Sequence, residues 1–275
     1  MTALLIDAGN SSIKWCLLKD NNLGVMQRCN YQALQNDKQK TPQQCIESII
    51  NSNQASAKSV FMVSVVGDNF ITNAQSYCAD LKLNFINITS STELAGVRNA
   101  YDEPQKLGAD RLVAMVAAQH QNKNPNDKQA NIIIDSGTAT TIDAVDESGQ
   151  HLGGLILPGF KLCTQSLLSN TKQLPLWGQS SGETMDDNQL NFIPEIFSKN
   201  TRLAIQSASV LGLAGAIDSI CSNMAKHFDK NISVNKILCG GSAKILQPYL
   251  QSTVTLNESL IMQGLKVIAE HTEPH

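Results

Sequence analysis

The sequence predicts an α/β protein built from two similar lobes, and three observations carry this prediction. First, the chain repeats itself, because LLIDAGNSSIK at residues 4–14 is echoed by IIIDSGTATTI at residues 132–142. Second, expected strands alternate with expected helices in both halves, which is the pattern of the α/β class. Third, 275 residues are enough for two ordinary domains. We place the first lobe at residues 1–121 and the second at residues 130–275.

The first lobe is expected to open with two strands joined by a tight turn. An apolar run at residues 3–8 ends in an aspartate and a glycine, and a second apolar run at 13–18 leads into a polar hairpin turn at 21–24. An Asn/Gln-rich stretch from 32 to 44 is typical of a loop. The remaining expected elements are helices at 44–50, 73–81 and 108–119 and strands at 60–66 and 84–88.

The second lobe follows a polar linker at residues 122–129, which we interpret as the domain boundary. Gly240 and Gly241 between a strand and a helix suit either a tight turn or a backbone that lies flat against a purine. The expected strands are at 131–135, 140–145, 153–159 and 237–239, and the expected helices run from 201 to about 228, from 243, and from 258 behind the N-cap candidate Asn257.

Composition excludes several classes of partner. The net charge of −3, from 21 basic and 24 acidic residues, lacks the electrostatic footprint of a nucleic-acid binder. The seven cysteines form no C-x-x-C pair and no metal-ligand cluster, and their odd number leaves no tidy disulfide set, so a cytoplasmic, reducing location is expected. No apolar run reaches the roughly 18 residues of a bilayer span, and no export signal precedes the first strand. We expect neither nucleic acid nor a membrane as a partner.

The repeated Asp-x-Gly turns are the first candidate functional feature. In the first copy Gly9 lets the backbone approach a phosphate, the polar side chains after it can donate hydrogen bonds, and Lys14 adds a positive charge. One such turn alone is most often an ordinary turn. Two copies favour lobes that each offer backbone N–H groups and a carboxylate, Asp7 or Asp135, to a polyphosphate and its metal. The sequence therefore predicts nucleotide-dependent phosphoryl transfer.

Asp110 and Arg111 at the start of the expected helix at 108–119 form the second candidate feature. The helix dipole favours an anion at this end, and Asp110 can face a hydroxyl group. Arg111 is one of only four arginines in the chain. The local pattern alone fits equally an acidic first helical turn followed by a surface arginine.

Taken in order, these segments resemble the type III pantothenate kinases. The resemblance implies the acetate and sugar kinase, chaperone and actin superfamily, with two ribonuclease H-like, actin-like ATPase lobes and a nucleotide cleft between them. The matching motifs are DAGNSSIK at 7–14, Tyr101, GADR at 108–111, DSGTA at 135–139, GGLILPG at 153–159, and KNT at 199–201 followed by AIQS at 204–207. Two features depart from the family pattern: Ser198 stands where the family usually carries glycine, and the segment at 174–196 is longer than expected.

The resemblance implies ATP-dependent phosphorylation of pantothenate to 4′-phosphopantothenate, the first step of coenzyme A biosynthesis, by a homodimer. It makes Asp110 the general base and Asp135 the ligand of a monovalent cation, K⁺ or NH₄⁺, while Mg²⁺ accompanies ATP. The dimer interface is implied to help complete the pantothenate pocket, and the helix from 201 to 228 is the candidate for part of it. The implied ATP contacts are Asp7, Ala8, Gly9, Asn10, Ser11, Ser12, Ile13, Lys14 and Thr138, and the implied substrate contacts are Tyr101, Gly108, Ala109, Asp110, Arg111 and Thr201.

Three alternatives stay open at this point. A nucleotide-binding regulator of the same fold would keep the phosphate loops and lose the base, against which Asp110 and Arg111 count. A phosphatase of the same superfamily would release free phosphate without an alcohol acceptor. A kinase of another small alcohol is the nearest rival, because the sequence predicts the reaction type better than the acceptor.

Overall fold

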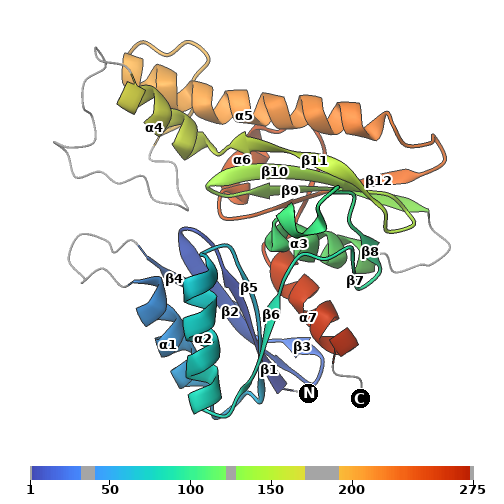
Figure 1. Ribbon diagram of the computed structural model, residues 1–275. Coiled ribbons are helices and arrows are strands. Elements are labelled where there is room, and N and C mark those ends of the chain that lie inside the picture. Colours follow the sequence, from blue (N-terminus) through green and yellow to red (C-terminus); the bar gives the residue numbers. More distant parts are fainter. Residues whose placement is uncertain (1, 32–40, 122–127, 171–191, 273–275) are drawn as a thin grey trace. The chain divides into compact units, whose positions relative to one another are not determined.

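The computed structural model describes residues 2–31, 41–121, 128–170 and 192–272 (Figure 1). Packing divides the chain into two units. The first unit takes Met1–Lys123, Gly149–His151 and Ser259–His275, and the second takes Asn124–Ser148 and Leu152–Glu258. The C-terminal helix α7 (Leu260–Thr272) therefore packs in the first unit. The sequence predicted this helix in the second lobe, because its apolar pattern does not indicate which sheet it covers.

The first unit is built on a six-stranded sheet in the order β3-β2-β1-β5-β6, with β4 also paired to β2. β1 pairs with β2 in antiparallel and with β5 in parallel orientation, so β1 is a central strand. The elements are β1 (Thr2–Ala8), β2 (Ser12–Lys19), β3 (Asn22–Leu23), β4 (Gln27–Asn30), α1 (Pro42–Asn53), β5 (Ser59–Ser64), α2 (Asp68–Asp80), β6 (Asn84–Ile88), the small hairpin β7 (Glu93–Leu94) and β8 (Val97–Arg98), the 3₁₀ turn at Pro104–Lys106, and α3 (Ala109–His120).

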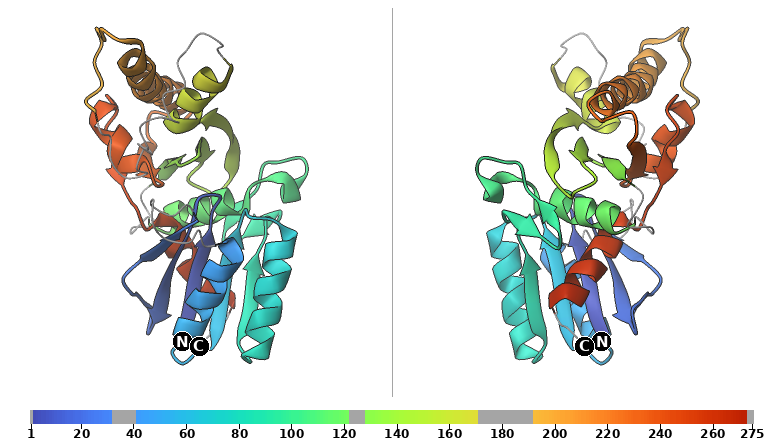
Figure 2. Two further views of the ribbon diagram at one scale, coloured as in Figure 1. Left: turned by 90° about the vertical axis from the view of Figure 1, so that its left-hand side faces the viewer. Right: turned by 90° about the vertical axis from the view of Figure 1, so that its right-hand side faces the viewer.

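Alternating side chains of β1 give the first unit a core on both faces of its sheet. Leu4 and Ile6 join the apolar cluster beneath α1 and α2, whereas Leu5 is buried from the other side. Helices α3 and α7 pack against each other and against that other face (Figures 1 and 2). The start of α1 is fixed by a capping box, in which the Thr41 hydroxyl accepts from the Gln44 backbone and the Gln44 side chain accepts from the Thr41 backbone.

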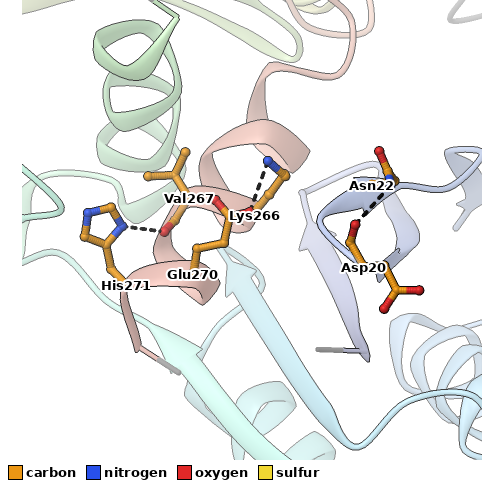
Figure 3. A network of polar contacts seen from close by, with 6 residues as sticks. All are labelled: Asp20, Asn22, Lys266, Val267, Glu270 and His271. Carbon is orange, nitrogen blue, oxygen red and sulfur yellow. Dashed lines mark hydrogen bonds and ion pairs between the residues drawn. The ribbon is translucent and has the colours of Figure 1, made fainter. Parts of the chain in front are cut away.

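The exposed side of α7 and the nearby β2–β3 turn are held by short-range contacts (Figure 3). On α7, Lys266 and Glu270 form an ion pair of 3.1 Å one helical turn apart, and His271 Nδ1 lies 2.8 Å from the Val267 carbonyl oxygen. At the turn, Asp20 has a positive φ of 49°, and its backbone carbonyl oxygen accepts from the side-chain Nδ2 of Asn22 at 3.0 Å. The polar turn predicted at 21–24 is confirmed, with β3 inside it.

The second unit repeats this design with a five-stranded sheet in the order β11-β10-β9-β12-β13. β9 pairs with β10 in antiparallel and with β12 in parallel orientation, as β1 pairs with β2 and β5 in the first unit. The elements are β9 (Gln129–Ser136), β10 (Ala139–Val145), β11 (His151–Pro158), α4 (Phe160–Asn170), α5 (Thr201–Ala225), β12 (Ser233–Cys239), α6 (Ala243–Leu246), the 3₁₀ turn at Gln247–Tyr249, and β13 (Thr255–Leu256). The duplication predicted from the sequence repeat is thus present in the strand topology.

Helix α5 has one face in the core of the second unit. Val210, Leu213 and Ile217 on this face are buried against the strands of their own sheet, so this side of the helix predicted for a subunit interface is core. Among the described residues α5 is the one helix long and apolar enough to cross a membrane by length and composition, with a mean hydropathy of 1.5 over its most apolar window. The sequence analysis found no run of this kind, because polar residues interrupt the apolar ones along the helix.

Cys29 and Cys45 form a disulfide that joins β4 to α1, with their Cα atoms 6.5 Å apart, a separation that disulfide geometry allows. The expectation of no disulfide set was therefore wrong for this pair. An odd number of cysteines excludes complete pairing but does not exclude one bridge. The other five cysteines are free thiols.

Candidate active site

The first Asp-x-Gly turn joins β1 to β2 and carries a carboxylate and an ammonium at paired positions. Asp7 and Lys14 lie directly opposite each other in the strand register, and Asp7 Oδ2 is 4.0 Å from Lys14 Nζ. Burial raises the pKa of Asp7 to about 6, against the lowering effect of Lys14. The turn is closed by the Gly9 amide, which donates to the Ser12 carbonyl at 3.0 Å.

The other residues of this turn divide into an exposed tip and a buried base. Asn10 and Ser11 are exposed at the tip. Ala8 and Ile13 are buried in the core, so only their backbone groups could contact a ligand. Ser12 is buried at 7% exposure.

Sequence reasoning missed two residues that the fold brings to this turn. Arg28 on β4 is the register partner of Lys14, so Asp7, Lys14 and Arg28 form a row across three strands. The hydroxyl of Tyr31 is buried without a hydrogen-bond partner, and the negative charge of Asp7 helps to raise its pKa. β4 is short and polar and gives no periodic signal, although the scarcity of arginine in the chain could have singled out Arg28.

Asp110 joins the Asp7 cluster from the first turn of α3. Its charge is near enough to contribute to the raised pKa of Asp7. Asp110 Oδ1 accepts from the backbone N–H of Arg111 at 2.8 Å. A Cβ on Gly108 would lie 2.6 Å from that oxygen, so glycine at this position leaves room for the carboxylate. The two predicted carboxylates of the first lobe are therefore brought together.

Arg111 is buried at 7% exposure, which excludes the surface arginine left open by its local pattern. Its Nη1 donates to the Tyr101 hydroxyl at 2.8 Å, and its guanidinium carbon lies 5.6 Å from the centre of the Tyr101 ring. The predicted substrate residues Tyr101, Gly108, Ala109, Asp110 and Arg111 thus form one group at the start of α3. This group combines a carboxylate with a buried, always-charged guanidinium.

The second Asp-x-Gly turn, between β9 and β10, is fixed by two neighbouring loops of its own unit. The Thr138 carbonyl oxygen accepts from the Gly159 amide at 3.0 Å, and the Ser136 carbonyl oxygen accepts from the Ser242 amide at 2.8 Å. Gly240 has a φ of +94°, and a Cβ there would collide with Asp135 Oδ1 and the Ser136 carbonyl oxygen. Only glycine fits this position.

The two turns differ in charge. Asp135 is the register partner of Thr141, whereas the corresponding residue Asp7 faces Lys14.

Thr201, the last predicted substrate residue, lies on a different element from the second turn. It is the exposed first residue of α5, directly after the N-cap Asn200. Within the described parts of the chain, no three His, Cys, Asp or Glu side chains are grouped closely enough to hold a metal ion by themselves.

Comparison with protein families and curated relatives gives one consistent result. The family model described as type III pantothenate kinase matches residues 3–223. The type III pantothenate kinase of Herminiimonas arsenicoxydans is 31% identical over 276 residues, which covers 98% of each chain. The type III pantothenate kinase of Nitrosospira multiformis is 31% identical over 274 residues, which covers 98% of this chain and 91% of that one.

Solved structures identify the fold. A protein described as a Baf family transcriptional activator from Campylobacter jejuni superposes with a TM-score of 0.55 at 20% identity, covering 98% of both chains. An archaeal actin homolog superposes with a TM-score of 0.51 at 11% identity, covering 98% of this chain and 100% of that one. At these identities the likeness shows the fold alone. The predicted actin-like fold is confirmed.

Proposed function

The chain belongs to the type III pantothenate kinase family, and from this premise we propose that it transfers the γ-phosphoryl group of ATP to the primary hydroxyl of pantothenate. The product is 4′-phosphopantothenate, an intermediate of coenzyme A biosynthesis. The observation that carries the proposal is the grouping of Asp110 with the buried Arg111 at the start of α3. That pair suits an acceptor with both a hydroxyl to deprotonate and a carboxylate to anchor.

Asp110 acts as the general base in this proposal. Its carboxylate accepts the hydroxyl proton of the acceptor while the hydroxyl oxygen forms a bond to the γ-phosphorus, and the bond to the bridging oxygen of ADP breaks. Two features support the role. Gly108 leaves room for the carboxylate, and the negative charge of Asp110 contributes to the raised pKa of Asp7, where the phosphates are expected.

Arg111 anchors the carboxylate of pantothenate. A guanidinium can bind a carboxylate through two parallel hydrogen bonds, and one that is already ordered loses less conformational entropy on binding. The Tyr101 hydroxyl orders Arg111 by accepting from its Nη1 at 2.8 Å. Gly108 and Ala109 would contribute backbone contacts beside this anchor, and Thr201 of the second unit is a further proposed substrate contact.

The phosphates of ATP are assigned to the turn from Asp7 to Lys14, with Thr138 of the second unit as a further contact. Lys14 and its register partner Arg28 provide two cationic side chains for the phosphates. The carboxylate of Asp7 is an oxygen ligand of the kind that Mg²⁺ takes together with phosphate oxygens, so this residue fits a metal that arrives with ATP. When bound, Mg²⁺ neutralises charge on the transferring group.

A monovalent cation, K⁺ or NH₄⁺, is assigned to Asp135. Its carboxylate oxygen and the Ser136 carbonyl oxygen both occupy the space that a Cβ on Gly240 would take, which gives two oxygen ligands in one place. The hydroxyl residue Thr141 stands where the first turn has Lys14. A bound cation would therefore supply in the second turn the positive charge that Lys14 supplies in the first.

A homodimer completes the proposal, together with a cytoplasmic location, which the five free thiols favour although one cysteine pair is bonded. The exposed side of α5 is a strip of small residues at helical spacing, Ala204, Ala208, Gly212 and Gly215, which would let the backbone of a second copy approach closely. Among the described residues, nothing beyond the helix's own neighbouring backbone lies within 4 Å of a Cβ built on Gly212 or Gly215.

The test is an assay of pantothenate-dependent ADP release, run with a panel of small hydroxylated acids. Pantothenate is expected to give the highest kcat/KM, with one phosphorylated product per ADP. Free phosphate in place of a phosphorylated acceptor would show a phosphatase. ATP binding without turnover of any acceptor would show a regulator, and a better acceptor than pantothenate would show a kinase of another alcohol.

A further inference from the structure

His151 is the most deeply buried histidine near the proposed acceptor residues, and no motif of the sequence singles it out. It is 1% exposed and lies in the three-residue segment Gly149–His151, which packs with the first unit while the chain on both sides of it belongs to the second. A buried polar ring at such a place requires contacts that hold it.

The segment is fixed against the small hairpin that precedes Tyr101. The Gly149 carbonyl oxygen accepts from the Arg98 amide at 2.9 Å, Gln150 forms a β-bridge with Arg98, and Gln150 Oε1 accepts from Arg98 Nε at 3.1 Å. Gly149 has a φ of +82°, and a Cβ there would collide with the carbonyl oxygen of Gly96. This glycine is therefore required for the close approach that brings His151 into the first unit.

The imidazole of His151 lies against Tyr101. The two rings are nearly parallel, at 17°, with their centres 6.0 Å apart, an offset-stacked pair. His151 Nδ1 also accepts a long hydrogen bond of 3.4 Å from the backbone N–H of Ala100, next to Tyr101 in the chain. Both the side chain of Tyr101 and the backbone leading into it are thus contacted by one histidine.

Tyr101 in turn holds Arg111 through the hydrogen bond of 2.8 Å and through the packing of the guanidinium over its ring. The contacts therefore run in sequence from His151 to Tyr101 to Arg111. A freely rotating Tyr101 would leave the guanidinium of Arg111 in several orientations, of which few would match a carboxylate bidentately.

We propose that His151 is a positioning residue for acceptor binding: its ring holds Tyr101, and Tyr101 orients Arg111 toward the carboxylate of the acceptor. This inference rests on the proposed function, because it assigns His151 to the anchor of the same substrate. His151 does not touch the reacting atoms. Its loss should therefore weaken binding of the acceptor and leave the chemical step unchanged.

The expected size follows from the stacking. An aromatic pair is worth about 0.5 to 1.5 kcal/mol beyond burial, so His151→Ala should raise KM for pantothenate about 2- to 12-fold with little change in kcat or in KM for ATP. His151→Phe keeps a flat, buried ring that can stack on Tyr101 and loses the long hydrogen bond from the Ala100 backbone. It should restore a KM close to that of the parent protein.

The experiment measures kcat and KM for pantothenate, and the dissociation constant of pantothenate by calorimetry, in the parent protein and in His151→Ala, His151→Phe, Tyr101→Ala and the Tyr101→Ala/His151→Ala double variant. His120→Ala is the matched control, because His120 packs edge-on against His271 in the same unit, with 5.5 Å between ring centres. The control should lower the melting temperature and leave KM unchanged. In the Tyr101→Ala background, His151→Ala should add no further rise in KM, because it acts through Tyr101.

The possible outcomes distinguish the role of His151 from the proposed function. A rise in KM with His151→Ala, its recovery in His151→Phe and its absence in the Tyr101→Ala background support the inference. An unchanged KM in His151→Ala, or a rise that adds in full to that of Tyr101→Ala, overturns the inference while the parent protein still phosphorylates pantothenate. A parent protein that neither binds nor phosphorylates pantothenate overturns the proposed function and this inference with it.

Discussion

Asp7 and Lys14 face each other across the β1–β2 hairpin, with 4.0 Å between carboxylate and ammonium, yet the pKa of Asp7 is raised to about 6. Burial therefore outweighs the attraction of Lys14, and the charge of Asp110 adds to the raised value. A carboxylate that is held in a cluster at a cost to the fold is typical of a functional site.

The first prediction is that Asp7→Asn stabilises the folded protein at neutral and alkaline pH. The folded pKa of Asp7, about 6, exceeds its ordinary value of 3.8, so the contribution of this group to stability is fully present below about 3.8 and is lost as the pH rises through 6. The variant avoids this loss, which amounts to at most about 3 kcal/mol. Its melting temperature should exceed that of the parent at pH 8, and the difference should shrink toward pH 4.

The control for that series is Asp20→Asn, at the exposed β2–β3 turn. This variant should track the parent protein at every pH. If the melting temperature of the parent protein rises relative to that of Asp7→Asn between pH 5 and pH 8, the raised pKa of Asp7 is contradicted.

The second prediction concerns the cation at the second turn. K⁺ or NH₄⁺ should raise the rate of phosphorylation strongly while Na⁺ does little, because oxygen ligands select a cation by its size and hydration. Asp135→Asn should abolish the difference between the rates in K⁺ and in Na⁺. Asp7→Asn should leave that difference unchanged. Equal rates in K⁺ and Na⁺ for the parent protein would remove the monovalent cation from the account.

The third prediction is that the protein is a dimer that contacts its second copy through the small-residue side of α5. Gly212→Leu has space within the chain itself, so the fold should survive, but the larger side chain should keep the second copy away. Sedimentation velocity should then show a dimer for the parent and a monomer for the variant. A parent protein that is a fully active monomer at nanomolar concentration would count against the dimeric site.

The fourth prediction counts thiols. In denaturant without reductant, five of the seven cysteines should react with a thiol reagent, and all seven should react after reduction. Mass spectrometry of an unreduced digest should link Cys29 to Cys45. Seven reactive thiols in protein that has been kept from reductant would show that this pair is not bonded.

The parts of the fold that the sequence predicted are those with a local signal. The strands β1, β2, β9 and β10 follow from two apolar runs around each Asp-x-Gly turn, and their repetition predicted the duplicated topology. β4 and α4 were missed because neither combines an apolar period with clear boundaries. The place of α7 in the first unit depends on which sheet its apolar side covers, and periodicity carries no information about that choice.

The residues of the candidate site divide in the same way, into those with a local sequence signal and those placed by tertiary contacts. Asp7, Lys14, Asp110 and Arg111 lie in continuous motifs, and the fold of the first unit brings them together. Arg28 and His151 reach the site by strand register and by loop packing between segments far apart in the chain. Contacts of that kind are set by the tertiary fold, so reading along one sequence does not find them.

The most direct test of the central claim is the turnover of Asp110→Asn, measured together with its affinity for ATP and for pantothenate. The substitution preserves size but removes the proton acceptor, so kcat should fall by about 10² to 10⁴. ATP should bind almost as tightly as to the parent protein, because the phosphates are assigned to the Asp7 turn, and pantothenate affinity should change far less than the rate. An Asp110→Asn protein that phosphorylates pantothenate near the parent rate would contradict the role of Asp110 as the base and, with it, the proposed mechanism.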